Sequence, residues 1–386
     1  MSLPDFDFHA PPRTVFRAGA AADLAAILNA VAPARRVLFV TDEGVRSLGL
    51  ADAALDGLKD AGVAAAVFDA IVADPPERVI LDAVEAARAY GADAVVGFGG
   101  GSPMDAAKLA AVLAGGDQPL SEMYGVGKVT NKRLPLVLVP TTAGTGSEAT
   151  PVAVVTTGET TKAGVSSPAL IPDVAVLDPD LTLGLPPAIT AATGIDAMVH
   201  AIEAYTSAVK KNPVSDALAV SALRLLSGSL LAACRDGSNR DARRAMLLGA
   251  SLAGQAFANA PVAAVHALAY PLGGVFHIPH GLSNALMLES VMRFNAPECA
   301  ALYSELEAAL DPSAVGSDSE RADRFVARMA RLCDEAGVQR RLRDVGVSHN
   351  DLPRLAADAM LQTRLLVNNP RPVDESDARA LYEQAW

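Results

Sequence analysis

The first half of the chain alternates short apolar runs with segments of helical periodicity. The apolar runs predict buried strands at 36–41, 64–69, 94–98, 136–139 and 175–177. The periodic segments between them predict helices at 44–58, 77–90 and 103–113. Such alternation is typical of crossover units that build a mostly parallel sheet. Two further β segments, around 152–155 and 162–165, indicate a hairpin in the same domain.

After Leu185-Pro-Pro187 the pattern changes to helical periodicity alone. Glycine, proline and asparagine interrupt it near residues 212, 237, 271–281, 311–318 and 368–372. A chain of 386 residues is also too long for one ordinary core. We therefore predict an α/β domain over 1–185 and an all-helical domain over 186–386.

Composition narrows the classes of partner. The chain has 32 Lys and Arg against 44 Asp and Glu, a net charge of −12, which argues against nucleic acid or an anionic membrane. The most apolar stretch, 253–276, contains Gln255, Asn259, two prolines and His266, so it reads as a buried helix and not as a membrane span. The three cysteines of the whole chain are scattered, which favours a reducing cytoplasm over a disulfide framework.

The spacing of four polar side chains in the second half predicts a metal site. Asp196 and His200 are four residues apart, so on a helix they share one face. His266 and His280 are too far apart to chelate within one turn. The segment between them contains Pro271, Gly273, Gly274 and Pro279, which should fold the chain back. The alternative is that each histidine is a hydrogen-bonded core residue.

Two glycine-rich loops follow predicted strands in the first half. Gly99, Gly100, Gly101 and Ser102 precede a helix, where Ser102 could be the cap and free N–H groups could bind phosphate; the alternative is a tight turn. The loop 140–148 is rich in hydroxyls, which suit ribose and pyrophosphate.

Two charged side chains extend this interpretation. Asp42 ends the first strand; it could accept from a ribose hydroxyl and repel a 2′-phosphate, which favours NAD over NADP, or it could cap the next helix. Lys162 could reach phosphate or ribose, or be solvated.

Taken together, these motifs resemble the iron-containing (group III) alcohol dehydrogenases. The resemblance rests on 99–108, 140–148, 194–203 and His266 through Gly281, in order and spacing, and extends to 368–371 and the final Ala-Trp386. It implies a Rossmann-like dinucleotide-binding domain, a helical domain of the dehydroquinate synthase-like type, and a cleft that holds metal and nicotinamide. It carries metal ligation onto Asp196, His200, His266 and His280, and cofactor contacts onto Asp42, Gly99, Gly100, Gly101, Ser102, Thr141, Thr142, Thr145 and Lys162.

One position departs from the family pattern. Many members have a histidine, with a role in proton handling, where this chain has Tyr270. His277 lies three residues before the last ligand. We favour His277 as the proton relay because histidine exchanges protons near neutral pH, with Tyr270 as the alternative.

These expectations define an NAD-linked oxidoreductase that interconverts a small alcohol and its aldehyde or ketone. The metal would act as a Lewis acid; nitrogen and oxygen ligands without thiolate suit Fe²⁺, with Zn²⁺ as the alternative. A homo-oligomer, a dimer or higher, is expected. The alternatives are a maleylacetate reductase-like or hydroxyacid–oxoacid enzyme, which would need a cation such as Arg364 or Arg371 for a carboxylate, a dehydroquinate synthase-like lyase, and a non-catalytic nucleotide-binding protein.

Overall fold

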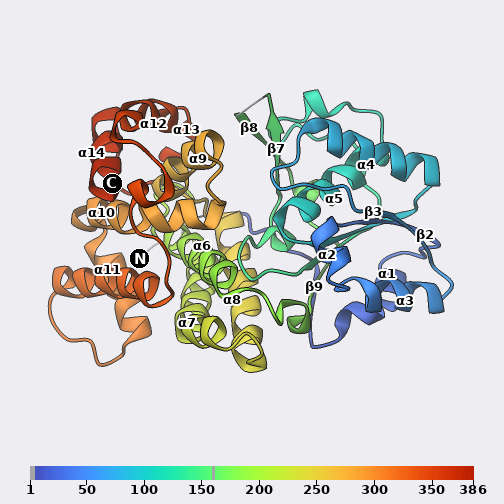
Figure 1. The fold of residues 1–386 in the computed structure, drawn as a ribbon, viewed down its shortest axis with the longest axis horizontal. Coiled ribbons are helices and arrows are strands. Elements are labelled where there is room, and N and C mark those ends of the chain that lie inside the picture. The colour runs from blue at the N-terminus through green and yellow to red at the C-terminus, as the bar shows by residue number, and fades with distance from the viewer. Residues whose placement is uncertain (1–4, 159–160) are drawn as a thin grey trace. The chain divides into compact units, whose positions relative to one another are not determined.

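The structure is a computed structural model that describes residues 5–158 and 161–386. The chain divides into two compact units. The sheet unit is His9–Leu183, and the helical unit is Gly184–Trp386 together with the described residues up to Phe8. Figure 1 shows the strands within the first unit and the helices α6 to α14 within the second.

The sheet unit is built on six parallel strands in the order β1-β9-β6-β4-β2-β3. Their bounds are β1 Arg13–Phe16, β2 Arg36–Val40, β3 Ala64–Phe68, β4 Ala94–Gly99, β6 Leu136–Pro140 and β9 Val174–Leu177. A separate three-stranded sheet has the order β5-β8-β7, with bounds β5 Gly125–Val126, β7 Val152–Thr157 and β8 Thr161–Ser166. The predicted hairpin is confirmed as the antiparallel pair β7 and β8.

Helices cover both faces of the parallel sheet because alternate strand residues point to opposite sides. Leu38 and Val95 pack with α4 Glu77–Tyr90 and α5 Gly101–Ala114, whereas Phe39 and Val96 pack with α1 Leu24–Asn29 and α3 Asp52–Asp60. Figure 1 shows these two helical layers on either side of the strands. The remaining short helices of this unit are α2 Glu43–Ser47 and the 3₁₀ segments η1 Ala20–Asp23, η2 Leu120–Glu122, η3 Ser147–Ala149, η4 Pro168–Leu170 and η5 Pro179–Thr182.

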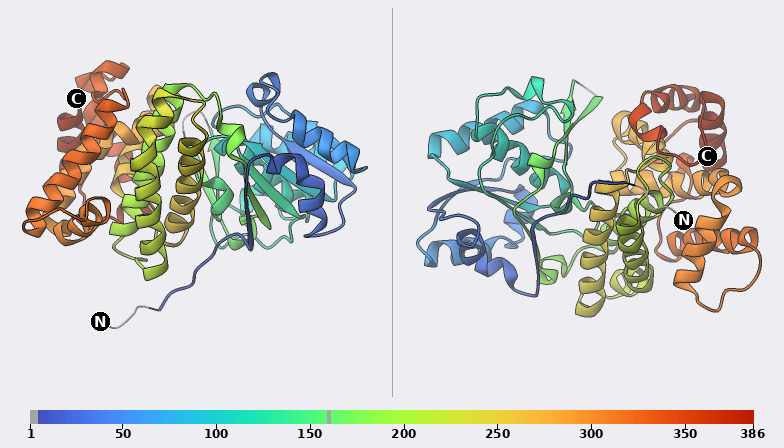
Figure 2. Two further views of the ribbon diagram at one scale, coloured as in Figure 1. Left: turned by 90° about the horizontal axis from the view of Figure 1, so that it is seen from below. Right: turned by 180° about the vertical axis from the view of Figure 1, so that it is seen from behind.

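In the helical unit, α6 Pro187–Thr206, α7 Pro213–Arg235 and α8 Arg240–Asn259 pack side by side (Figure 2). The other elements are α9 Ala264–Phe276, α10 His280–Leu310, α11 Asp318–Glu335, η6 Leu342–Val345, η7 His349–Asp351, α12 Leu352–Met360, α13 Thr363–Leu366 and α14 Glu375–Ala385. By length and composition, α7 is the one described helix that could span a bilayer. However, α6 and α8 pack along α7, as expected of a core helix in a bundle.

The prediction of a parallel α/β domain followed by a helical domain is confirmed, two local predictions are wrong, and one edge strand was not predicted. The helix expected over 44–58 is two helices, because Gly49 adopts a left-handed φ of 69° between them. The apolar stretch 253–276 is not one helix: α8 ends at Asn259 ahead of Pro261, and α9 starts afterwards. The edge strand β1 was not predicted.

Candidate functional site

Four side chains that could bind one metal ion lie together in the helical unit. Helix α6 supplies Asp196 and His200, α9 supplies His266, and α10 supplies His280. One ligand atom from each lies within 4.8 Å of the others. The Oδ1 atom of Asp196 is 3.8, 3.9 and 3.7 Å from the Nε2 atoms of His200, His266 and His280, respectively. Residues far apart in the sequence therefore converge as the spacing predicted.

A glycine permits this convergence. A Cβ atom at Gly281 would lie 2.5 Å from the carbonyl oxygen of Ala192 and 2.8 Å from its carbonyl carbon. Real Cβ atoms are not found this close to a backbone. The first turn of α10 therefore lies against α6 only because residue 281 has no side chain, and this contact places His280 beside Asp196.

The chain reverses between α9 and α10 over three residues. His277 ends α9 in the left-handed region, with φ 54° and ψ 29°, and Pro279 precedes the first residue of α10. The chain does fold back between His266 and His280, as predicted, and Pro279 lies at the reversal, whereas Pro271, Gly273 and Gly274 lie inside α9 and do not cause it.

Three side chains of the cluster are buried and the fourth is partly exposed. The Asp196, His200 and His266 side chains are at most 5% exposed, whereas the His280 side chain is 39% exposed. Burial would raise the pKa of the Asp196 carboxyl, but the three imidazoles and the Asn284 amide together outweigh it, so the pKa lies below its ordinary value. This favours the charged carboxylate that a cation requires.

The donor set fits a divalent ion. Ligand atoms about 2.0–2.2 Å from an ion lie about 3.3–3.6 Å from one another in a tetrahedral site. The separations between Asp196 Oδ1 and the three Nε2 atoms, 3.7 to 3.9 Å, differ from that range by a few tenths of an ångström. One carboxylate and three neutral imidazoles would leave a net charge of about +1 around a divalent ion.

Two further polar residues contact the cluster and were not predicted. The Asn284 Nδ2 atom is 2.6 Å from Asp196 Oδ1 and within 3.3 Å of the Nε2 atoms of His266 and His280. The Glu203 Oε2 atom is 2.6 Å from His266 Nδ1. The signal was present: Asn284 is four residues after His280, and Glu203 is seven residues after Asp196 on the same face of α6.

The two candidate proton relays lie at different places. Tyr270 is on α9, and its ring centroid is 6.0 Å from that of His280. His277 is exposed at the reversal between the helices. The structure therefore brings Tyr270 beside one of the four clustered histidines and places His277 three residues before it.

In the sheet unit, two of the predicted cofactor residues, Asp42 and Gly99, lie where the strand order reverses. After β2 the chain adds β3 on one side and then returns to add β4 on the other. In open parallel sheets, ligands bind outside the carboxyl ends of the strands at this reversal. Asp42 follows β2, and Gly99 ends β4, so both stand at that point.

Asp42 and Gly99 lie close together. The Asp42 Oδ1 atom accepts from the Val45 N–H at 2.8 Å and caps α2, so the cap alternative is confirmed. Its Oδ2 atom is 3.2 Å from the position of a Cβ at Gly99, which has φ 149°. Such a Cβ would also lie 2.8 Å from Pro103 Cγ, so only glycine fits here.

The two glycine-rich loops lie against each other. The Thr141 N–H donates to the Gly99 carbonyl at 3.0 Å. A Cβ atom added at Gly101 would lie 3.1 Å from Thr145 Cγ2. One added at Gly100 would lie 3.9 Å from Thr142 Oγ1. Thr142 and Thr145 are part-exposed, whereas Thr141 is buried.

Ser102 and Lys162 have partners other than those predicted. Ser102 does not cap α5, because the helix already begins at Gly101; its hydroxyl accepts from the Asp74 N–H at 3.3 Å. Lys162 Nζ is 2.7 Å from Asp74 Oδ1, so it forms an ion pair and is not simply solvated. Asp74 therefore links the start of α5 to β8.

Lys108 on α5 is fully buried and holds a loop in place. Its ammonium donates to Ser147 Oγ at 2.8 Å, Thr150 Oγ1 at 3.1 Å and the Val152 carbonyl at 2.7 Å. Burial lowers the pKa of Lys108, against the opposing effect of Asp105. Because these partners follow β6, Lys108 fixes the end of the threonine-containing loop to α5.

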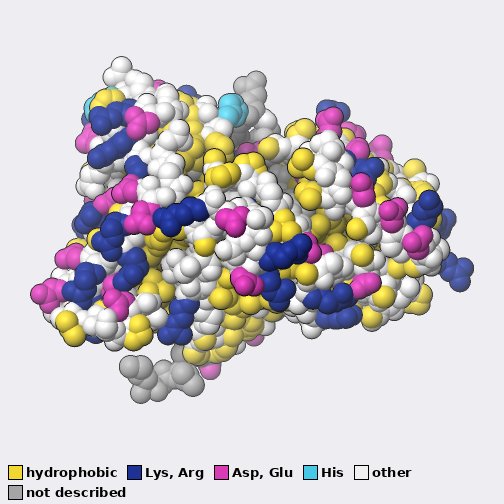
Figure 3. Space-filling view, turned by 60° about the horizontal axis from the view of Figure 1, so that its bottom comes forward, with side chains coloured by type: hydrophobic (Ala, Val, Ile, Leu, Met, Phe, Trp, Pro, Cys, Tyr) yellow, Lys and Arg dark blue, Asp and Glu magenta, His cyan; other side chains and the backbone are white. Residues whose placement is uncertain are grey.

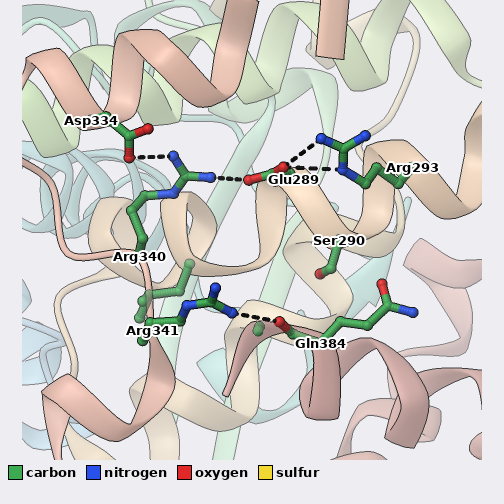
Figure 4. Close-up of a pocket in the computed structure, with 9 residues that line it drawn as sticks. Glu289, Ser290, Arg293, Asp334, Arg340, Arg341 and Gln384 are labelled. Carbon is green, nitrogen blue, oxygen red and sulfur yellow. Dashed lines mark hydrogen bonds and ion pairs between the residues drawn. The ribbon is translucent and has the colours of Figure 1, made fainter. Parts of the chain in front are cut away.

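The helical unit also has a polar surface pocket that contains none of the four clustered residues. Figure 4 shows Glu289 between Arg293 and Arg340, with Arg341 donating to the Gln384 carbonyl. These arginines already have acceptors within the pocket. More widely, basic and acidic side chains are interspersed on the face of the molecule drawn in Figure 3.

Known proteins resemble this chain over nearly its full length. Residues 11–179 match the family described as iron-containing alcohol dehydrogenase, and residues 190–386 match the C-terminal part of the Fe-containing alcohol dehydrogenase family. The chain is 44% identical over 357 residues to long-chain-alcohol dehydrogenase 1 of Geobacillus thermodenitrificans (strain NG80-2), which covers 92% of this chain and 90% of that protein.

Solved structures agree. A crystal structure of 1,3-propanediol oxidoreductase has a TM-score of 0.94 at 36% identity, covering 99% of this chain and 100% of that chain. The sulfoacetaldehyde reductase of Bifidobacterium kashiwanohense, solved in complex with NAD+, has a TM-score of 0.89 at 29% identity and covers 99% of both chains. Since both halves match the same family, the chain belongs to the iron-containing alcohol dehydrogenases, enzymes that interconvert alcohols and their aldehydes or ketones.

Proposed function

We propose that this enzyme uses NAD(H) and one divalent cation to interconvert a small alcohol and its aldehyde or ketone. The observation that carries the proposal is the convergence of one carboxylate and three imidazole nitrogens within 4.8 Å. Four polar side chains rarely gather in a protein core without a ligand, because each buried polar group needs its own hydrogen-bond partner.

Asp196, His200, His266 and His280 would hold the cation. Fe²⁺ suits these ligands and the family's name, with Zn²⁺ as the alternative. When bound, the cation supplies a Lewis acid that lowers the pKa of an alcohol or polarises a carbonyl. Because His280 is the one ligand with substantial exposure, substrate would approach from its side.

Residues at the strand-order reversal would bind NAD(H). The N-terminus of α5, behind Gly99, Gly100, Gly101 and Ser102, would receive the pyrophosphate. The adjacent loop with Thr141, Thr142 and Thr145 would contact ribose and pyrophosphate. The Asp42 Oδ2 atom, the oxygen that does not cap α2, would accept from a ribose hydroxyl. Lys162 would contact phosphate or ribose after exchanging its partner Asp74.

The proton released by the alcohol needs an acceptor. We assign this role to His277, with Tyr270 as the alternative. His277 is exposed, so it can exchange protons with solvent, and imidazole is effective near neutral pH. The pH profile of kcat should distinguish the variants His277→Ala and Tyr270→Phe. The variant that lacks the proton acceptor should show a flattened profile, and the other variant should not.

A carboxylated substrate has less support. Arg371 donates to the Phe294 carbonyl at 2.9 Å and stacks over the Phe294 ring at 3.8 Å, so its guanidinium is already engaged. Related proteins are named for long-chain alcohols, 1,3-propanediol and lactaldehyde, which are uncharged, and for sulfoacetaldehyde, which is an anion. Because three of these four are uncharged, a neutral alcohol or diol is the first class to test.

The assembly and location are also proposals. We expect a homo-oligomer in the cytoplasm. Strand β1 supports the oligomer, because it lies at the edge of its sheet and an edge strand presents backbone groups to a second copy. Light scattering after gel filtration measures the mass directly.

The test is NADH formation across ethanol, longer primary alcohols, 1,3-propanediol and lactate, with NADP+ in parallel. The protein is stripped with chelator and then restored with Fe²⁺ or Zn²⁺. We expect turnover with NAD+ only after restoration, and none for His200→Ala. Full turnover by the stripped protein, or by His200→Ala, would refute the proposal.

A further inference from the structure

The Glu203 carboxylate connects two elements of the candidate metal site. It comes from α6, three residues after His200, and only about 4% of the residue is exposed. Its Oε1 atom accepts from the Val265 N–H at 2.7 Å. Its Oε2 atom is 2.6 Å from His266 Nδ1. One buried carboxylate is therefore shared between a backbone donor and a candidate ligand.

The backbone contact replaces a missing helix cap. Helix α9 begins at Ala264, and the residue before it, Ala263, has no side chain that could accept from the first turn. The Val265 N–H is one of the donors that a helix start leaves without an intrahelical partner. Glu203 supplies that acceptor from a different helix, and its negative charge suits the positive end of α9.

The second contact determines which ring nitrogen of His266 carries the proton. A carboxylate oxygen only accepts, so at 2.6 Å the Nδ1 atom must be the donor. In a neutral imidazole the Nε2 atom then has its lone pair available. This is the atom that lies 3.9 Å from Asp196 Oδ1. Glu203 thus aims the ring and selects its tautomer together.

We infer that Glu203 is a positioning residue that sets the His266 tautomer and fixes its ring toward the cation; this rests on the proposed function of the cluster. It explains why a buried carboxylate is present beside the one that would bind the ion. An outer carboxylate of this kind changes metal affinity by about 10- to 100-fold where it has been removed from histidine ligands.

Glu203→Gln tests the inference with almost no change in shape. The amide oxygen can still accept from Val265 N–H, but the amide NH₂ then faces His266 Nδ1 and requires it to accept. The proton moves to Nε2, which can no longer bind an ion. Glu305→Gln is the matched control, because Glu305 is a carboxylate of the same unit that accepts from Tyr205 OH at 2.6 Å.

Two measurements are made. Nuclear magnetic resonance of histidine-¹⁵N-labelled, metal-free protein identifies the His266 tautomer, with His266→Ala for assignment. Titration with Co²⁺, followed by its visible absorption, gives the Kd. We expect the Nδ1–H tautomer in the wild type and in Glu305→Gln, the Nε2–H tautomer in Glu203→Gln, and a Kd about 10- to 100-fold weaker for Glu203→Gln alone.

The outcomes separate two failures. An Nε2–H tautomer in the wild-type protein overturns the inference even if Glu203→Gln does not fold. An unchanged tautomer and an unchanged Kd in Glu203→Gln overturn it as well. Wild-type Co²⁺ binding by His266→Ala would instead refute the metal site itself, whereas the tautomer in the metal-free protein would still decide the role of Glu203.

Discussion

Substitution of Gly281 by alanine should separate the two helices that carry Asp196 and His280. The added Cβ would lie 2.5 Å from the Ala192 carbonyl oxygen, whereas a relaxed carbon–oxygen contact is about 3.3 Å. The first turn of α10 must therefore move by about 0.8 Å. Overpacking of this kind costs about 1–3 kcal/mol of folding free energy.

The shift has a larger effect on the cluster than on the fold. If it lies along the line between the ligand atoms, the 3.7 Å between Asp196 Oδ1 and His280 Nε2 becomes about 4.5 Å, beyond the span of about 4.2 Å that two bonds to one ion cover even in line. We expect a Co²⁺ Kd at least about 10-fold weaker and a kcat lower by about 100-fold, the usual cost of misplacement by 1 Å.

Gly228→Ala is the matched control. Gly228 is exposed on α7, and an added Cβ there meets no atom within 4 Å. It should stabilise the protein by about 0.5–1 kcal/mol through helix propensity and leave the Kd unchanged. Thermal unfolding and Co²⁺ titration of both variants make the comparison. If Gly281→Ala binds Co²⁺ with the wild-type Kd, the spacing of α6 and α10 does not determine the site.

Three further predictions concern single side chains. Asp42→Ser keeps an N-cap acceptor, so stability should stay within about 0.5 kcal/mol, while the kcat/KM ratio of NADP+ to NAD+ rises; an unchanged ratio argues against a ribose contact. Lys108→Met leaves buried oxygens without their donor and should cost about 3 kcal/mol or more in urea unfolding, against almost none for the exposed control Lys59→Met. The pKa of Asp196 is lowered in the folded protein, so its carboxylate stabilises the metal-free fold above the unfolded-state pKa of about 3.9, and this contribution is lost as pH falls. The stability difference between wild type and Asp196→Asn, measured in chelator, should shrink from pH 6 to pH 3, and a constant difference would contradict the assignment.

The sequence predicted the elements whose pattern is decided locally. Strands β2, β4, β6 and β9 are almost continuous apolar runs because both faces of the parallel sheet are buried there. Strand β1 escaped prediction because Arg13–Phe16 is short and partly exposed, and it is a strand only through its pairing with β9. Of the residues predicted to fold the chain back, Pro279 lies at the reversal, next to the left-handed residue His277, whereas Pro271 lies inside α9.

In the candidate site, too, the features decided within one helix could be predicted and those that depend on packing could not. The i, i+4 pair on α6 could be read from spacing because both residues share one helix face. Spacing also places Glu203 and Asn284 on the same helix faces as candidate ligands, but it does not give their roles, which depend on how α6, α9 and α10 pack. Asp42 shows a further difficulty: its Oδ1 atom caps α2, which leaves Oδ2 for the proposed cofactor contact, so the two roles that were treated as alternatives are compatible.

The most direct test is anomalous diffraction at the iron edge from crystals of the Fe²⁺-restored protein. The account predicts one strong peak about 2.0–2.3 Å from a carboxylate oxygen of Asp196 and from the Nε2 atoms of His200, His266 and His280. An active enzyme whose peak lies elsewhere, or that shows none, would contradict it.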